Sequence, residues 1–524
     1  AVARGAALVV GSYVPYYVKD SAQLQYALGA DANTAKNVVL GPRAAAVAAG
    51  LDLNSALPAD RVSTLYLDSE ALSATKLGSI KVASTGSILV SGALEVEPAG
   101  DITLFGPKIE VNANLTAHSG SLQLGNVQAQ ITPTAKNDVT LGGRGSLVVN
   151  AGVSLDTSGL WSNQLLSVSD SSRLPYLNGG NVALRSSGDV SLAAGSRVDV
   201  SSGAALDARN QLIGGKGGDV TLAANANSAD SRGNLALNGE LLGYGVSGGG
   251  RLSVQAGKVL ISDQPAAPQA GTLQLDSGFF NKGFGAYDIT GNEGLLVADG
   301  TQVDVTAPVY RLNDTAQNLV SGADPRSALQ IWTPPQYRET PTKGQLTLRK
   351  GASLSLQAGT ALSTAAQMAA VQARIGQGAV INVDPGQSIG VRSIGQLTVD
   401  GTLNAWGGTI TLGGVSVQPT VADGVEAKGH DRSIWVDEHA VLDVAARAAT
   451  AVDSLGRRYG VVGQGGTIVI GGVIDPATGI ASAANLFVVV REGARLDASG
   501  SQALLDLSGA CLLYTSDAAD ERSS

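Results

Sequence analysis

Pairs of apolar residues recur along this chain at a nearly constant spacing. The two members of a pair are separated by a single residue, which is polar in most pairs. In residues 79–125 the pairs are separated by Gly, Ser, Asn or Asp, a pattern typical of half-buried strands of three or four residues. Every third pair returns after about 20–22 residues, a period in the range of repeat proteins. The equivalent residues are Ile80 and Ile102, Ile88 and Ile109, Leu94 and Leu115, and Ile102 and Leu122. A constant period with three strands in each repeat predicts an all-β, right-handed, single-stranded parallel β-helix with three sheet faces.

The same spacing returns far downstream. It separates Ile381 from Leu403, and it separates Ile389 from Ile410. Gly-Gly pairs precede several of the apolar pairs, where corners between faces need a positive φ or a close backbone approach. These glycines are 179–180, 217–218, 249–250, 407–408 and 465–466. We therefore expect one long solenoid whose corners carry glycine.

Composition narrows the class of protein further. Only 4% of the 524 residues are aromatic, so the core must be built from Val, Leu, Ile and Ala. Lys and Arg number 35 against 44 Asp and Glu, and this acidic balance argues against a nucleic-acid partner. The single cysteine, Cys511, excludes an internal disulfide. No apolar run is long enough to cross a bilayer, so no transmembrane segment is expected.

The repeat pattern divides the chain into five segments. They are an irregular lead-in (1–60), a β-helix rod (61–304), a Pro-rich excursion (305–345), the continued rod (346–510) and a tail that resembles translated sequencing-adapter read-through (511–524). Good helix formers over 361–375 predict a short helix lying on the rod. A uniform period predicts about 18 or 19 coils and a rod about 90 Å long.

Two local clusters invite a metal or catalytic interpretation. The first contains His430, Asp431, Asp437, Glu438 and His439, residue types that bind metals or transfer protons. A solvated loop around the strand 434–436 explains the cluster more simply. The remaining histidine is His118.

The second cluster, 214–219, matches part of a calcium-binding β-roll repeat. That site needs tandem copies, whereas this chain has one, and Thr221 replaces the expected apolar residue. A Gly-rich corner is therefore favoured.

Aspartates also recur near the ends of the expected strands. They are Asp156, Asp199, Asp207, Asp384, Asp400 and Asp497. Because they recur at corner positions, capping of corners is favoured over catalysis. Trp406, at a corner of its own, is expected to cover an apolar edge rather than to bind a ligand. We accordingly predict no catalytic, cofactor-binding or metal-binding residues, and no enzyme activity.

Two stretches resemble filamentous-haemagglutinin-type exoproteins. They are NGGNVALRSSGDVSLAAGSRVDVSSG (178–203) and VDPGQSIGVRSIGQLTVDGTLNAWGGTITLGG (383–414). The resemblance covers roughly residues 60–510 and implies an interior fragment of a large adhesin, a virulence factor secreted to the surface of a Gram-negative bacterium. It implies export by two-partner secretion through an outer-membrane transporter, and adhesion to host-cell or surface glycans or proteins.

The alternative is a carbohydrate-active β-helix enzyme, a polysaccharide lyase or hydrolase. Three or more carboxylates on one sheet face within two coils would favour this alternative.

Overall fold

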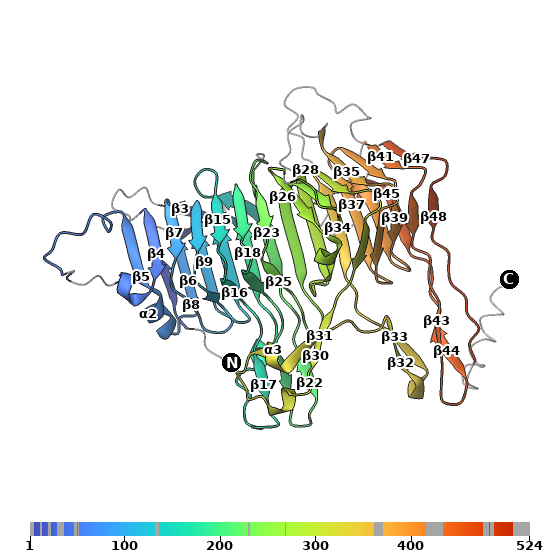
Figure 1. Cartoon of the computed structure of the whole chain (residues 1–524), viewed down its shortest axis with the longest axis horizontal. Helices are drawn as coiled ribbons and strands as arrows, with labels where there is room; N and C mark the ends of the chain where they lie inside the picture. Colours follow the sequence, from blue (N-terminus) through green and yellow to red (C-terminus); the bar gives the residue numbers. More distant parts are fainter. Residues whose placement is uncertain are drawn as a thin grey trace.

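The structure is a computed structural model in which most of the chain is described. The described residues are 5–10, 13–18, 23–28, 36–46, 50, 52–131, 136–228, 231–267, 269–360, 370–415, 433–474, 481–482 and 487–506. Strands account for 46% and helices for 7%, so the fold is mostly β. Most strands pair in parallel, and they lie side by side along the long axis of the molecule (Figure 1).

The largest sheet in the described chain has 18 strands. They are β1 (Ala7–Val10), β6 (Ser79–Ala83), β9 (Asp101–Phe105), β12 (Ser121–Gly125), β18 (Asn181–Arg185), β23 (Val220–Ala223), β26 (Arg251–Ile261), β27 (Thr272–Leu275), β28 (Ala286–Val297), β34 (Ser353–Ala358), β35 (Gln372–Ile375), β37 (Ser388–Ser393), β38 (Gln396–Val399), β40 (Thr409–Gly414), β41 (Ser433–Val436), β45 (Thr467–Ile474), β46 (Ala481–Ser482) and β47 (Phe487–Val490). All of these pairings are parallel except that of β45 with β46.

Three smaller parallel sheets accompany the large one. The seven-stranded sheet contains β4 (Asn37–Gly41), β5 (Thr64–Asp68), β7 (Ser87–Val90), β10 (Lys108–Val111), β15 (Ser146–Val149), β19 (Asp189–Leu192) and β24 (Leu235–Leu237). One five-stranded sheet contains β8 (Leu94–Glu95), β11 (Leu115–Thr116), β16 (Ser154–Asp156), β20 (Arg197–Asp199) and β25 (Glu240–Leu242). The other contains β29 (Gln302–Val305), β36 (Val380–Val383), β39 (Thr402–Asn404), β42 (Val441–Asp443) and β48 (Arg495–Asp497).

One row of apolar side chains crosses the large sheet from strand to strand, and we call it the central row. Its members pair in register in the order Leu8, Ile80, Ile102, Leu122, Val182, Val220, Leu252, Tyr287, Leu354, Ile389, Ile410 and Ile468. The pairings predicted from the spacing are confirmed here and in the smaller sheets. The latter are Ile88 with Ile109, Leu94 with Leu115 and Ile381 with Leu403.

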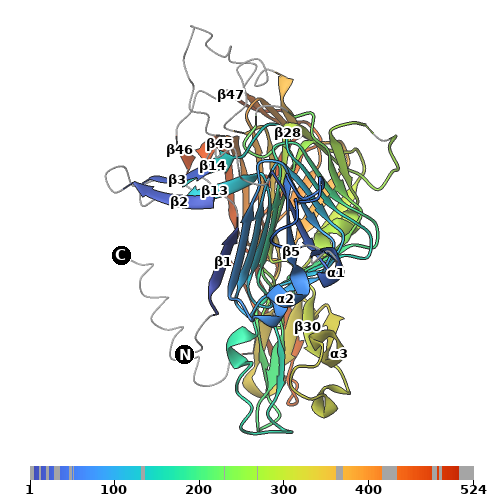
Figure 2. The same cartoon turned by 90° about the vertical axis from the view of Figure 1, so that its left-hand side faces the viewer.

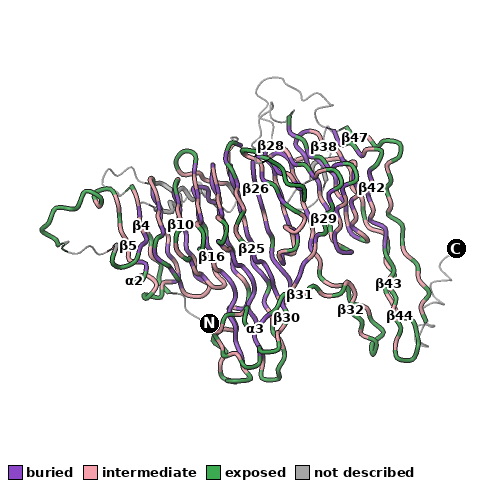
Figure 3. The backbone as a smooth tube through the Cα atoms, in the orientation of Figure 1, coloured by how far each residue is buried: buried purple, intermediate pink, exposed green. Residues whose placement is uncertain are grey.

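The core follows these rows through the length of the molecule. Strand residues alternate between buried and partly exposed, as in β18, where Val182 and Leu184 are buried and their neighbours are not. Buried residues accordingly line the inside of the body (Figure 3). One aromatic group interrupts the aliphatic core. Tyr287 is fully buried with its ring centroid 5.6 Å from that of Phe280, and its hydroxyl accepts a hydrogen bond from the Lys282 N–H at 2.9 Å.

The uniform period fails as a measure of the number of strands. It predicts about 18 or 19 strands for each face, but the central row has 11 members from Ile80 to Ile468. The reason is that one period separates Ile389 from Ile410, whereas a much longer connection separates Tyr287 from Leu354. Insertions leave the row at its corners and return to it without changing the register.

Several insertions fold as antiparallel hairpins. They are β2 (Tyr13–Val18) with β3 (Gln23–Leu28), β13 (Val127–Ile131) with β14 (Lys136–Thr140), β30 (Val309–Leu312) with β31 (Leu329–Trp332), β32 (Tyr337–Thr340) with β33 (Gln345–Leu348), and β43 (Ala449–Val452) with β44 (Arg458–Val461). Seen along the long axis, β2–β3 and β13–β14 project on the same side of the body (Figure 2).

The first part of the excursion, 309–329, packs onto a separate small sheet of β17 (Trp161–Asn163), β21 (Ala204–Leu206) and β22 (Leu212–Gly214), whereas β33 of the later hairpin contacts β43 and β44. A second core forms between them, in which Trp161 is fully buried and Tyr310 of β30 is 5% exposed. The Trp161 indole N–H also donates a hydrogen bond to the Leu319 carbonyl oxygen at 3.1 Å. We call this unit the satellite core, and it lies below the parallel sheets in Figure 1.

Helices are short and peripheral. The described α-helices are α1 (Arg43–Ala46), α2 (Ser69–Ala74) and α3 (Pro325–Ala328), and the described 3₁₀ helices are η1 (Leu174–Tyr176), η2 (Ser277–Asn281), η3 (Ala316–Asn318) and η4 (Pro341–Lys343). No helix among the described residues has the length and apolar character needed to cross a membrane. The expected helix over 361–375 is wrong at its end, because 372–375 form β35 in the large sheet. Its first part, 361–369, lies outside the described residues, as does the tail 511–524. Parallel pairing begins before residue 61, since β1 and β4 pair with β6 and β7.

Glycine at the corners serves mainly close approach. An added Cβ at Gly218 would lie 1.7 Å from the Gly180 carbonyl oxygen, and one at Gly180 would lie 2.1 Å from that of Gly120. Of the Gly-Gly pairs named above, only Gly407 has a positive φ, at 62°. At Gly180 and Gly218 the corner backbones are therefore stacked too closely to admit a side chain.

Candidate binding groove

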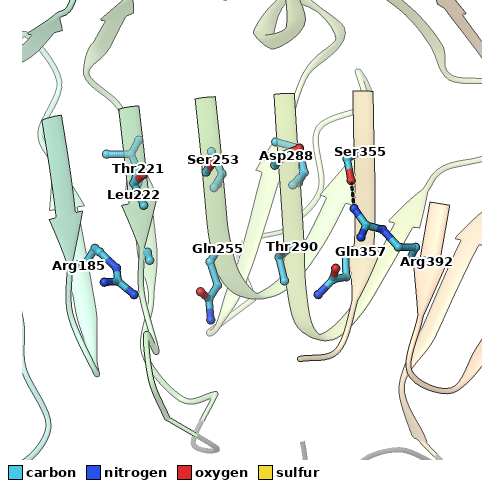
Figure 4. Close-up of a pocket in the computed structure, with 13 residues that line it drawn as sticks. Arg185, Thr221, Leu222, Ser253, Gln255, Asp288, Thr290, Ser355, Gln357 and Arg392 are labelled. Atoms are coloured by element: carbon cyan, nitrogen blue, oxygen red, sulfur yellow. Dashed lines mark hydrogen bonds between the residues drawn. The ribbon is translucent and has the colours of Figure 1, made fainter. Parts of the chain in front are cut away.

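The outward face of the large sheet is hollowed where six neighbouring strands meet. Two adjoining hollows share Arg185, Thr221 and Ser253, and together they form one groove. Its floor crosses β18, β23, β26, β28, β34 and β37, and β12 borders it beside β18. Its polar floor consists of Arg185, Thr221, Ser253, Gln255, Asp288, Thr290, Ser355, Gln357 and Arg392 (Figure 4). These side chains point outward because they alternate along each strand with the buried apolar residues.

The hairpin β13–β14 forms one end of the groove. Asp138 on β14 receives two hydrogen bonds from the Arg185 guanidinium, at 3.0 and 2.5 Å. The Asn227 side-chain amide donates to the Asp138 carbonyl oxygen at 3.1 Å and to the Thr140 hydroxyl at 3.0 Å. The hairpin is therefore fixed to the sheet by a two-point ion pair and by a neighbouring corner.

Arg392 lies at the other end of the groove. Its Nη2 donates a hydrogen bond to the Ser355 hydroxyl at 2.8 Å, and none of the ion pairs in the described part of the chain includes it. The nearby Asp288 carboxylate is paired with Arg251 instead. Burial lowers the pKa of Arg392 from its ordinary value, and Asp288 partly offsets this shift, but a guanidinium remains charged at neutral pH.

Two glutamines complete the floor between the arginines. The Gln255 amide donates to the Asn292 side-chain oxygen at 3.0 Å, and Asn292 is 5% exposed. The Gln357 amide donates to the Gly359 carbonyl oxygen at 2.9 Å. Gln255 is thus held by a side chain within the neighbouring strand β28, and Gln357 by the backbone just after its own strand β34.

Of the aspartates singled out from the sequence, Asp156 and Asp199 come together. They are direct neighbours in the register of β16 and β20. Asp199 is 2% exposed, and burial, followed by repulsion from Asp156, raises its pKa. The adjoining positions of the same ladder hold Thr116 and Leu242, so the ladder brings two carboxylates together there rather than three.

Local partners surround this pair. The Asp199 carboxylate accepts a hydrogen bond from the Ser201 N–H at 2.9 Å, and the Arg326 Nη1 of α3 lies 4.0 Å away. The His118 Nδ1 lies 3.9 Å from the Asp156 carboxylate. The pair therefore sits where the satellite core meets the parallel strands.

The other four aspartates each have partners of their own. These are the backbone N–H groups of Arg209 and Gln211 for Asp207, the Arg349 guanidinium for Asp384, His439 for Asp400, and the Ser499 N–H and hydroxyl for Asp497. Each arrangement caps a turn or forms a single ion pair, and none adds to the groove.

The histidine cluster is only partly described. The His439 Nδ1 lies 3.1 Å from the Asp400 carboxylate, and its Nε2 lies 4.0 Å from that of Glu438. Asp437 is paired with Arg491 at 2.6 Å. His430 and Asp431 lie outside the described residues. Within the described ranges, no three His, Cys, Asp or Glu side chains are grouped so as to hold a metal ion.

The glycine-rich segment 214–219 leads from β22 to β23. The Asp219 carboxylate accepts a hydrogen bond from the Arg251 N–H at 2.8 Å, and its own N–H donates to the Asn181 side-chain oxygen at 3.0 Å. Thr221, two residues later, lies on the groove floor. The segment thus aligns β23 with its two neighbouring strands.

Trp406 is half-buried at its corner. Its indole N–H donates a hydrogen bond to the Asp443 carboxylate at 3.1 Å, and the Arg447 guanidinium lies 5.1 Å from the ring centroid. The tryptophan is therefore held by polar neighbours on and after β42, not only by the apolar edge that was expected.

The groove was missed in the sequence although a signal for it exists. Arg185 and Arg392 each follow directly after the second apolar residue of a pair, in VALR and IGVR. That position points outward next to the central row. A search for long polar side chains at this position would have found both arginines.

Comparison with known proteins identifies no relative of this chain. No protein-family model, curated protein or solved structure matches the chain. The groove and its charges are therefore interpreted from their own geometry.

Proposed function

We propose that the chain is the rod of a large, non-enzymatic adhesin of the filamentous-haemagglutinin type, and that its parallel sheets are the faces of a right-handed β-helix. The protein would be secreted to the surface of a Gram-negative bacterium through an outer-membrane transporter of the two-partner type. Its exposed faces would contact glycans or proteins on host cells or other surfaces.

The order in which strands join the sheets carries this proposal. From β6 onward, successive strands enter the large, the seven-stranded and the first five-stranded sheet in turn: β6, β7 and β8, then β9, β10 and β11. The order returns with β18, β19 and β20, and with β23, β24 and β25. A chain that visits three faces in rotation winds as a coil, and parallel crossovers are right-handed in nearly all proteins.

The architecture suits adhesion because it is extended. Each coil of a solenoid contacts only its neighbours, so the rod can lengthen without a larger core. The groove floor extends over six strands and contains hydroxyl, amide and charged side chains in turn. An extended polar face of this kind can hold a polymer or a flat surface by many weak contacts.

A carbohydrate-active enzyme is the second candidate, and the Asp156–Asp199 pair beside His118 is the observation that favours it. Two neighbouring carboxylates with different environments can divide acid and base roles. In this chain, however, each carboxylate accepts a hydrogen bond from a backbone N–H two residues on, at 2.8 Å for Asp156 and 2.9 Å for Asp199. Such bonds are typical of aspartates that cap turns.

One experiment separates the two candidates. Beads coated with the chain are applied to epithelial cells and to matrix proteins, and beads coated with the urea-unfolded chain serve as the control. The adhesin proposal expects retention of the folded-chain beads only. Retention equal to the control would overturn it, and so would release of new reducing ends from polysaccharides that disappears in D156N or D199N.

A further inference from the structure

The groove is lined by two arginines and two aspartates, Arg185, Arg392, Asp138 and Asp288, and one of the arginines has no ion-pair partner in the described part of the chain. Arg185 is neutralised by Asp138, and Arg251 by Asp288, which leaves Arg392 without a carboxylate partner in the described part of the chain. Arg392 is thus a cation outside any ion pair in the described part of the chain, although the chain as a whole has a net charge of −9. A partly buried guanidinium with unused N–H groups is the protein group best suited to bind a carboxylate with two parallel hydrogen bonds.

The rest of the floor restricts what can carry that carboxylate. Thr221, Ser253, Thr290 and Ser355 present hydroxyls, and two glutamines present amides, on adjacent strands. The lining of both hollows includes no aromatic residue, so stacking on a ring cannot be the main source of affinity. A ligand rich in hydroxyl groups can instead exchange its water contacts for hydrogen bonds to this floor.

The shape of the groove indicates an elongated ligand. Six neighbouring parallel strands about 4.8 Å apart give a floor about 24 Å long between Arg185 and Arg392. The polar side chains repeat with each strand, which suits a chain molecule lying across the strands with equivalent groups along its length.

We propose that this groove binds an acidic polysaccharide, with a uronic-acid carboxylate on Arg392 and sugar hydroxyls on the Thr, Ser and Gln floor. The inference rests on the proposed adhesive function for its biological meaning, since it names the ligand class of the exposed face. Its test is independent of that function because binding is measured in solution without cells.

The probes are an oligomer of galacturonic acid, a neutral glucose oligomer of equal length and a short polyglutamate peptide. Isothermal titration of the full chain should detect the oligouronate, and both other probes should bind about tenfold or more weakly. If polyglutamate binds as tightly as the oligouronate, the groove attracts acidic chains in general. If the glucose oligomer binds as tightly, the carboxylate does not contribute to recognition. Either result, or no binding of any probe, overturns the proposal.

Three variants locate the contact. R392Q should weaken oligouronate binding about tenfold or more, and R392K less, because lysine keeps the charge but loses the two-point geometry. R374Q is the matched control, since Arg374 is also on the large sheet but is paired with Asp299 at 3.5 Å outside the groove. Equal losses in R392Q and R374Q would refute the assignment.

A variant that is expected to strengthen binding distinguishes a lost contact from a loss of folding. D288N removes the carboxylate beside Arg392 and releases Arg251, so it should tighten oligouronate binding. Weaker binding in D288N with an unchanged melting temperature would contradict the charge argument. Oligouronate binding without bead adhesion would refute the adhesive function alone, whereas adhesion unaffected by R392Q, with no oligouronate binding, would refute the groove alone.

Discussion

Replacing Gly218 by alanine tests whether the corner backbones are stacked as closely as the structure indicates. The new Cβ would lie 1.7 Å from the Gly180 carbonyl oxygen, whereas real Cβ atoms essentially never approach another atom within 3.0 Å. The two corners must therefore move apart. That shift strains the bond from the Gly218 N–H to the Val200 carbonyl oxygen, now 2.8 Å, and the bond from the Val182 N–H to the Asp219 carbonyl oxygen, now 2.9 Å.

The magnitude follows from two contributions. Overpacking a tight site costs about 1–3 kcal/mol, and each weakened backbone hydrogen bond costs about 1 kcal/mol. We expect G218A to lower the local free energy of unfolding by about 3 kcal/mol or more. Gly390 on β37 is the matched control, because the nearest atom to its added Cβ is the Ser355 hydroxyl at 4.0 Å. G390A should be neutral or stabilising by about 0.4–1 kcal/mol.

Hydrogen exchange measured by mass spectrometry is the suitable assay, since it reports the opening of individual segments rather than the unfolding of the whole chain. Peptides covering β18 and β23 should exchange faster in G218A and at the original rate in G390A. Equal protection in the two variants would refute the close stacking of the corners.

Leu122→Ala removes a fully buried member of the central row and should lower the free energy of unfolding by about 2–5 kcal/mol. Gln123→Ala, on the exposed side of the same strand, should change it by less than about 0.5 kcal/mol, and urea unfolding compares the two. Trp161→Ala should destabilise the satellite core by about 3–5 kcal/mol, so limited proteolysis should cut within 305–345 sooner; an unchanged cutting pattern would count against a separate core. The raised pKa of Asp199 means that the folded state binds its proton more tightly than the unfolded state, so stability is lost as pH rises from about the ordinary value of 3.8 through the raised pKa. Asp199→Asn should therefore raise the melting temperature at neutral pH and leave it unchanged at a pH below 3.8. A change in melting temperature of equal size at the two pH values would show that the aspartate does not titrate as described.

The local spacing of the sequence was enough to predict which strands pair where the connection between the paired strands is short. Ile102 and Leu122 illustrate this, because three short strands and their corners use up the whole stretch of chain between them. Leu122 and Val182 are also neighbours, but the hairpin β13–β14 and a long corner intervene. No periodicity spans such an insertion, so the number of strands in each sheet could not be counted from the sequence.

The groove could not be predicted from the sequence for the same reason, because it depends on the lengths of the connections between paired strands. Arg392 contacts Ser355 on the preceding strand of the sheet, far back in the sequence, and Arg185 contacts Asp138 on an inserted hairpin. The outward position of each side chain follows from the alternation of its strand. The number of residues in each corner decides which outward side chains become neighbours. The pattern of apolar residues does not predict that number.

The variable spacing of the central row also indicates how easily insertions and deletions can be tolerated in this chain. The connection from Tyr287 to Leu354 is far longer than the one from Ile102 to Leu122. Closing a flexible loop costs an entropy that grows only with the logarithm of its length, so the longer connection costs only about 1 kcal/mol more than the shorter one. One additional buried aliphatic side chain offsets that difference. Corners of this molecule can therefore acquire whole new segments, such as the excursion that builds the satellite core, at almost no thermodynamic penalty to the row that they interrupt.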